Sequence, residues 1–97
     1  MSKTTFSNKC AILGELWMWH KDTDDEVWSE FFDWADIGLP LAFMIKQGYA
    51  TAKDKGKASV EECWKIFCEM IDIDPDLRYE SLEDAFDASG NDPLPAV

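Results

Sequence analysis

An apolar segment in the middle of the chain, residues 28–45, constrains the fold more than any other feature. It holds four large aromatic side chains and then seven consecutive apolar residues: Trp28, Phe31, Phe32, Trp34 and 39–45. Burying one large apolar side chain stabilises a fold by roughly 1.5–3 kcal/mol, so this segment belongs in the core. Gly38 and Pro40 interrupt it, and a proline disfavours helical dihedral angles in the residue before it. We therefore expect two apolar helices joined by a tight bend.

The remaining apolar residues also follow helical spacing, with no strand-like alternation longer than about four residues. The clearest helix is predicted over 60–71, where the residues at i, i+3, i+4, i+7, i+8 and i+11 are Val60, Cys63, Trp64, Phe67, Cys68 and Ile71. Further helices are predicted over about 8–20, 24–37 and 40–50, and a last short one from Ser81 to Ser89. The expected fold class is all-α, a compact bundle of four to five helices. At 97 residues we expect one domain, 1–97, with loose tails at 1–6 and 91–97.

Short polar residues that can cap helix N-termini precede four of these segments. They are Ser7 or Asn8, Thr23, Ser59 and Ser81. Thr23 and Ser59 are each followed three residues later by a glutamate, which is the pattern of a capping box. Gly90 is expected to end the last helix.

The net charge of −11 is concentrated in two segments. Residues 22–36 contain seven acids and no base, and residues 69–92 contain nine acids and a single arginine. Nucleic acids and anionic membranes bind through lysine and arginine, so we expect neither as a direct ligand. A dense array of carboxylates can instead resemble a phosphate backbone to a basic partner.

The cysteines and the N-terminus indicate the cellular compartment. Three cysteines without paired spacing, and an N-terminus without an apolar signal region, predict free thiols and a cytoplasmic protein. The longest apolar run, 39–45, is far shorter than the roughly 20 residues of a membrane span. A zinc site would need Cys10, His20, Cys63 and Cys68, which lack any Cys-x-x-Cys spacing. We expect no cofactor.

Residues 72–83 have the acid spacing of an EF-hand calcium loop. Positions 1, 3, 5, 9 and 12 are Asp72, Asp74, Asp76, Glu80 and Glu83. Position 6, where a glycine makes the sharp turn, is Leu77. The favoured interpretation is that these acids serve turns and helix starts, with calcium binding as the alternative.

The five tryptophans suggest an interaction surface. Trp17 and Trp19 project from nearly opposite sides of their helix, and Trp28 and Trp34 lie on different parts of the next one. Either a wide apolar face buries them inside a tight bundle, or some form an exposed aromatic patch that anchors a partner. The candidate contact residues are Trp17, Trp19, Trp28, Trp34, Asp24, Asp25 and Asp33.

The segment Asp36-Ile37-Gly38-Leu39-Pro40-Leu41-Ala42-Phe43, after an aromatic and acidic helix and before Asp72-Ile73-Asp74-Pro75, resembles a group of small acidic proteins. These are uncharacterised proteins encoded by marine bacteriophages and cyanobacteria, and the resemblance spans roughly Leu13 to Phe86. The group has no assigned function, so the resemblance implies only a phage or marine microbial protein that acts by binding.

Three functions follow from these features. The first is a non-enzymatic protein that acts through an unknown protein partner, or as a homodimer through its first two helices. The second is a DNA-mimic inhibitor of a nucleic-acid-binding host protein, using Asp24, Asp25, Asp33, Asp76, Glu83, Asp84 and Asp87. The third is a calcium-responsive module built on residues 72–83. We expect no enzymatic activity, because no nucleophile or acid–base motif stands out and His20 is the sole histidine.

Overall fold

All regular secondary structure in the described part of the chain is helical. The computed structural model describes residues 3–90, and the helices are α1 (Phe6–His20), α2 (Glu26–Trp34), α3 (Gly38–Lys46), α4 (Lys55–Met70) and α5 (Leu82–Ser89). The predicted all-α class is confirmed. Among these five helices, none combines the length and the apolar character that crossing a membrane requires.

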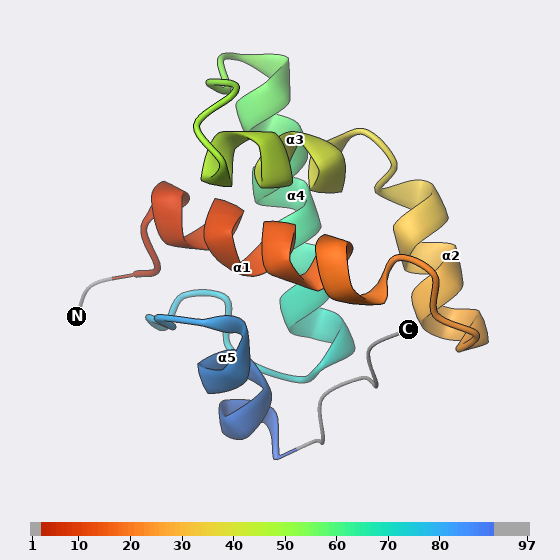
Figure 1. Ribbon diagram of the computed structural model, residues 1–97. Helices are drawn as coiled ribbons and strands as arrows, with labels where there is room; N and C mark the ends of the chain where they lie inside the picture. The colour runs from red at the N-terminus through yellow and green to blue at the C-terminus, as the bar shows by residue number, and fades with distance from the viewer. Residues whose placement is uncertain (1–2, 91–97) are drawn as a thin grey trace.

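The other helices pack around α4. Figure 1 shows α4 passing behind α1 and α3, with α2 to one side and α5 below. Val60, Trp64 and Phe67 of α4 are almost completely buried, because their spacing places them on one face of the helix. The same cluster includes side chains from the other four helices, among them Leu13, Leu16, Phe31, Phe32, Leu39, Ala42 and Phe86. One continuous core therefore connects all five helices.

The closest helix crossing is between α1 and α3. A Cβ atom added to Gly14 would lie 2.8 Å from the backbone Cα of Phe43. One turn further along α1, the Trp17 ring packs against the Phe43 ring with centroids 5.3 Å apart. Gly14 thus allows the two backbones to approach more closely than any side chain would permit.

The start of α2 differs from the predicted capping box. Asp25, not Thr23, is the N-cap, and its carboxylate accepts a hydrogen bond from the amide of Trp28 (3.0 Å). The Thr23 hydroxyl accepts from the Asp25 amide instead (3.2 Å), which forms a tight turn before the helix. Glu26 becomes the first helical residue, so its negative charge lies at the positive end of the helix.

The predicted starts of α1 and α4 are also wrong. The N-cap of α1 is Thr5, whose hydroxyl accepts a hydrogen bond from the amide of Asn8 (3.1 Å). The cap therefore lies before Ser7 and Asn8, the residues expected to provide it. α4 begins at Lys55, which leaves Ser59 inside the helix and not at its N-cap. The extra turn of α4 contains lysine and alanine, which are good helix formers, and it packs Gly56 against the side chain of Leu41.

The helix ends follow local rules more closely. Ser81 caps α5 as predicted, and Gly90 ends it in a left-handed conformation. α3 and α4 end with a left-handed residue at the same position, Gly48 with φ 82° and Asp72 with φ 59°. In both, the next backbone amide donates to the carbonyl five residues earlier (2.9 Å). This motif normally uses glycine, so Asp72 holds a conformation that is costly for a residue with a side chain.

Residues 4–6 are not part of the loose tail that we expected at 1–6, and residues 1–2 lie outside the described residues. Thr4 is buried, and its hydroxyl donates to the carbonyl of Leu77 and accepts from the amide of Tyr79, both at 2.9 Å. Phe6 already belongs to α1. These bonds tie the N-terminus to the loop between α4 and α5, more than 70 residues away. The predicted tail at 91–97 lies outside the described residues.

We predict that Thr4→Val destabilises the fold, because the substitution keeps the shape but leaves the Leu77 carbonyl and the Tyr79 amide without their partner. Each unsatisfied buried group costs about 1–3 kcal/mol, so the free energy of unfolding should fall by about 2 kcal/mol in urea denaturation. Thr51→Val, in an exposed loop, is the control and should change it by less than about 0.5 kcal/mol. Equal stability of Thr4→Val and wild type would show that this anchor contributes nothing.

We also predict that Gly14→Ala lowers the free energy of unfolding by about 1–3 kcal/mol, because the new methyl group must push α1 away from the α3 backbone. Gly56→Ala is the matched control, since its methyl group would meet side-chain atoms and no backbone: the flexible end of Leu41 at 3.0 Å and the Ala52 methyl group at 3.8 Å. Thermal and urea denaturation measure both variants. An unchanged Gly14→Ala protein would mean that the crossing relaxes without cost.

Candidate functional site

α2 has one side in the core and the other in solvent. Phe31 and Phe32 are buried. Val27 and Trp34 lie on the flank of the helix next to Phe31, and they are 63% and 51% exposed. The Trp34 ring still contacts the Phe31 ring, with centroids 6.2 Å apart. Ile37, in the turn after the helix, is 71% exposed. Val27 and Trp34 are seven residues apart, or about two helical turns, so they lie on the same face. Trp34 belongs to the apolar segment that we expect in the core, whereas the structure leaves half of its side chain exposed.

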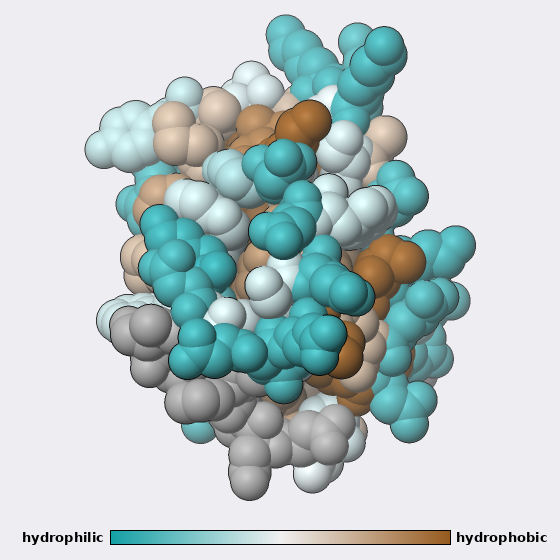
Figure 2. Space-filling view, turned by 90° about the vertical axis from the view of Figure 1, so that its right-hand side faces the viewer, coloured by the Kyte–Doolittle hydropathy of each residue, from teal (hydrophilic) through white to brown (hydrophobic). Residues whose placement is uncertain are grey.

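An acidic stripe runs beside these apolar residues. Glu26, Glu30 and Asp33 follow i, i+4 and i+7 spacing, and all three are exposed. We call the two sets together the α2 outer face: Val27, Trp34, Ile37, Glu26, Glu30 and Asp33. Figure 2 views the molecule from the side on which α2 lies in Figure 1, and hydrophilic residues dominate this view with hydrophobic ones exposed between them.

No positive charge neutralises the α2 outer face. In the described chain the salt bridges are Lys3–Asp76, Lys9–Glu61 and Arg78–Glu80, and none of them includes an acid of residues 22–36. Asp25 is engaged at the helix cap, and its neighbour Asp24 is exposed. The exposed apolar side chains of α2 therefore lie in a strongly negative electrostatic field.

The predicted tryptophan patch is only partly present. Trp17 is half-buried against Phe43, and the ammonium group of Lys21 lies 4.4 Å from its ring centre. Trp28 packs against the core, with its ring 6.1 Å from that of Phe67. These two residues contribute mainly to packing. Trp19 and Trp34 are the exposed members of the predicted set, each at 51%.

A small cavity lies where the corner between α2 and α3 meets α4. Its volume is about 190 Å³, and it is lined by Trp34, Ala35, Asp36, Ile37, Gly38, Ser59, Glu62 and Cys63. Two members of the α2 outer face, Trp34 and Ile37, thus also belong to this cavity, which we call the corner pocket. Its lining includes two exposed carboxylates, Asp36 and Glu62, and no lysine or arginine.

The acids of the predicted calcium loop do not converge on a common point in the described structure. Asp74 accepts a hydrogen bond from the amide of Asp76 (2.9 Å), which is a turn-forming contact. Glu80 instead pairs with Arg78 (2.6 Å), and this contact lowers the pKa of its carboxyl group. Leu77 lacks the positive φ of a sharp glycine turn, since Asp72 is the left-handed residue of this loop. Within residues 3–90, no three or more histidine, cysteine or acidic side chains come together to hold a metal ion.

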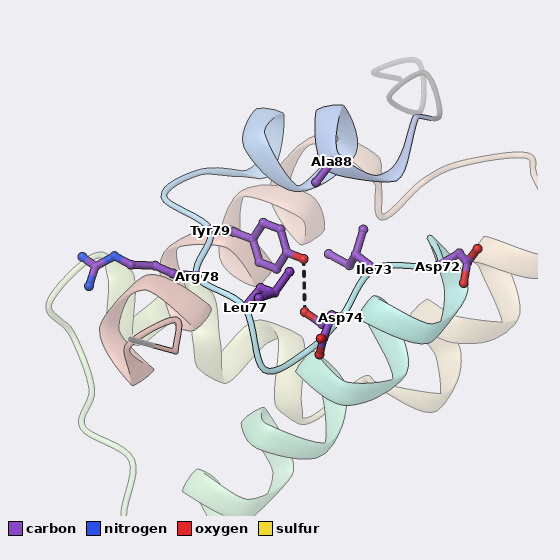
Figure 3. A pocket seen from close by; sticks show the side chains of 7 residues that line it. All are labelled: Asp72, Ile73, Asp74, Leu77, Arg78, Tyr79 and Ala88. Carbon is purple, nitrogen blue, oxygen red and sulfur yellow. Dashed lines mark hydrogen bonds between the residues drawn. The ribbon is translucent and has the colours of Figure 1, made fainter. Parts of the chain in front are cut away.

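A larger cavity of about 520 Å³ lies between this loop and α5. In Figure 3 the hydroxyl group of Tyr79 donates to the backbone carbonyl of Asp74 (3.1 Å), while Arg78 and Asp72 lie at opposite ends of the view. Burial raises the pKa of Tyr79, so its phenol stays protonated and holds the loop together. The charged groups around this cavity do not converge on a common point, so we regard the cavity as a consequence of the loop structure.

A third cavity, of about 790 Å³, runs along α4 beside the N-terminal segment. Lys9 pairs with Glu61 at 2.7 Å, and Lys3 pairs with Asp76 at 3.3 Å. The other charged residues of its lining, Glu62, Lys65 and Glu69, include both signs, so the charges of this groove nearly balance, unlike those of the corner pocket.

The three cysteines are buried and carry free thiols. Burial, the largest cause in each case, raises the pKa of Cys10 and Cys63 to about 11 and that of Cys68 to about 12. Nearby carboxylates, such as Glu62 beside Cys63, act in the same direction. A thiol is reactive as its thiolate, so these cysteines behave as core side chains.

Sequence reasoning missed part of this site. Val27 and Ile37 were not among the candidate contact residues, although the seven-residue spacing of Val27 and Trp34 beside an acidic stripe was a visible signal. Asp36 and Glu62 were missed as pocket residues because α4 reaches the α2–α3 corner only through the tertiary fold.

Comparison of the chain with protein-family models, curated protein sequences and solved structures finds no match. The marine phage resemblance therefore stays a prediction.

We predict that the native thiols resist Ellman's reagent at neutral pH, because burial both blocks access and keeps them protonated. All three should react rapidly once the chain is unfolded in guanidinium chloride, which serves as the control. Absorbance at the nitrothiobenzoate band measures both rates. Rapid reaction of one thiol in the native protein would contradict the buried placement of that cysteine.

Proposed function

We propose that this chain is a non-enzymatic binding protein whose α2 outer face engages a basic segment of a protein partner. The observation that carries the proposal is the combination of large apolar side chains with an acidic stripe on one helix. Isolated exposed apolar residues are common on protein surfaces, but Val27 and Trp34 lie two turns apart on one face of α2, and Ile37 follows in the turn directly after the helix. Such a surface matches an amphipathic partner whose apolar residues alternate with lysine or arginine.

The charge distribution favours a different partner over a second copy of this chain. In a twofold dimer through the α2 outer face, the acidic stripe of one copy would meet the same stripe of the other. Like charges placed opposite each other at an interface are strongly unfavourable, and each chain carries a net charge of −11. A basic segment removes this repulsion and neutralises Glu30 and Asp33.

The proposal is tested by panning a random peptide display library on the immobilised protein. We expect the enriched peptides to combine basic and apolar residues. Calorimetry with the synthetic peptides should show that Val27→Ser/Ile37→Ser weakens binding by at least about tenfold, because these side chains provide the apolar contact. Trp19→Ala is the control, since Trp19 is as exposed as Trp34 but lies on α1.

Two outcomes would contradict this proposal. Equal affinity of the double variant and the wild type would show that the peptides bind elsewhere. Binding that survives the double variant, but disappears at high salt and on neutralising Asp24, Asp25 and Asp33, would favour the DNA-mimic alternative, in which carboxylates alone make the contact.

A further inference from the structure

The corner pocket combines an aromatic wall with an acidic rim. Trp34 and Ile37 supply exposed apolar surface, and Gly38 and Cys63, both buried, supply its deeper lining. A Cβ atom added to Gly38 would lie 2.5 Å from the Cys63 sulfur, so the glycine lets the start of α3 pack directly on α4. The resulting volume of about 190 Å³ suits one long side chain and not a larger ligand.

The charges of the corner pocket are unbalanced. Asp36 approaches it from the turn between α2 and α3, and Glu62 from α4, and neither takes part in a salt bridge of the described chain. An apolar side chain that filled the pocket would remove water from these carboxylates without replacing its hydrogen bonds, which is unfavourable. A cationic side chain would satisfy them.

We propose that the corner pocket binds one arginine side chain of the basic partner segment, an inference that rests on the proposed function of the α2 outer face. The planar guanidinium group can stack on the Trp34 ring while its N–H groups donate to Asp36 and Glu62. Arginine fits this combination better than lysine, because lysine offers a compact point charge without a planar face. The pocket thus selects an arginine anchor, and Val27 receives the neighbouring apolar residue of the partner.

The test is a nuclear magnetic resonance titration of the ¹⁵N-labelled protein with N-acetyl-arginine methylamide. N-acetyl-citrulline methylamide, which has nearly the same shape but no charge, is the matched ligand. We expect saturable shifts of the Trp34 indole and Gly38 amide signals with the arginine compound, and much smaller shifts with citrulline. The Trp19 indole signal should not move.

Asp36→Asn/Glu62→Gln should weaken arginine binding by at least about tenfold, since it removes both charges of the pocket. Glu69→Gln/Asp87→Asn is the control, because it changes the net charge equally at exposed positions outside the pocket. Equal shifts with arginine and citrulline, or equal binding by the two double variants, would overturn the inference.

The two proposals can fail separately. Basic peptides that depend on Val27 and Ile37, together with no saturable arginine effect at Trp34, would overturn the arginine pocket and leave the proposed function standing. A saturable arginine effect without any peptide binding to the α2 outer face would overturn the proposed function while supporting the pocket.

Discussion

The rest of the fold depends on the close crossing of α1 and α3 at Gly14. Because these two backbones nearly touch, α3 is fixed against α1, and both are then held on α4 by its buried aromatic side chains. α2 lies between α1 and α3 in the chain and connects to them through short segments, residues 21–25 and 35–37. These short connections restrict where α2 can lie. Phe31 and Phe32 close one side of the core, and the opposite side of the helix faces solvent.

This position explains why apolar and acidic residues meet on one surface. The apolar residues of this nine-residue helix cover so much of its circumference that the core cannot bury all of them, so Val27 and Trp34 stay partly outside. The acids beside them keep the surface hydrated and oppose self-association, since two such faces repel each other. The same acids would attract a basic segment. In the proposed complex, the acids that keep this face hydrated would also select a partner of opposite charge.

The sequence predicted what depends on local physics. Helical spacing identified the five helices, and Ser81 and Gly90 mark the ends of α5 because capping needs only neighbouring residues. Thr23 is not the N-cap of α2, because Asp25, two residues later, occupies that position in the folded chain. Thr4 could not have been recognised, since its partners lie more than 70 residues away. For α2, the sequence placed Trp34 with Phe31 and Phe32 in the core, because helical spacing does not show how much of a wide apolar face its neighbours cover.

The most direct measurement is the quenching of tryptophan fluorescence by caesium and by iodide, compared between the wild type and Trp34→Phe. The difference between the two proteins isolates the signal of Trp34. If its ring is exposed within the acidic field of α2, caesium should quench this signal much more strongly than iodide, and added sodium chloride should reduce the difference by screening. Equal quenching by both ions would contradict a negative surface around Trp34, and no quenching by either would contradict its exposure.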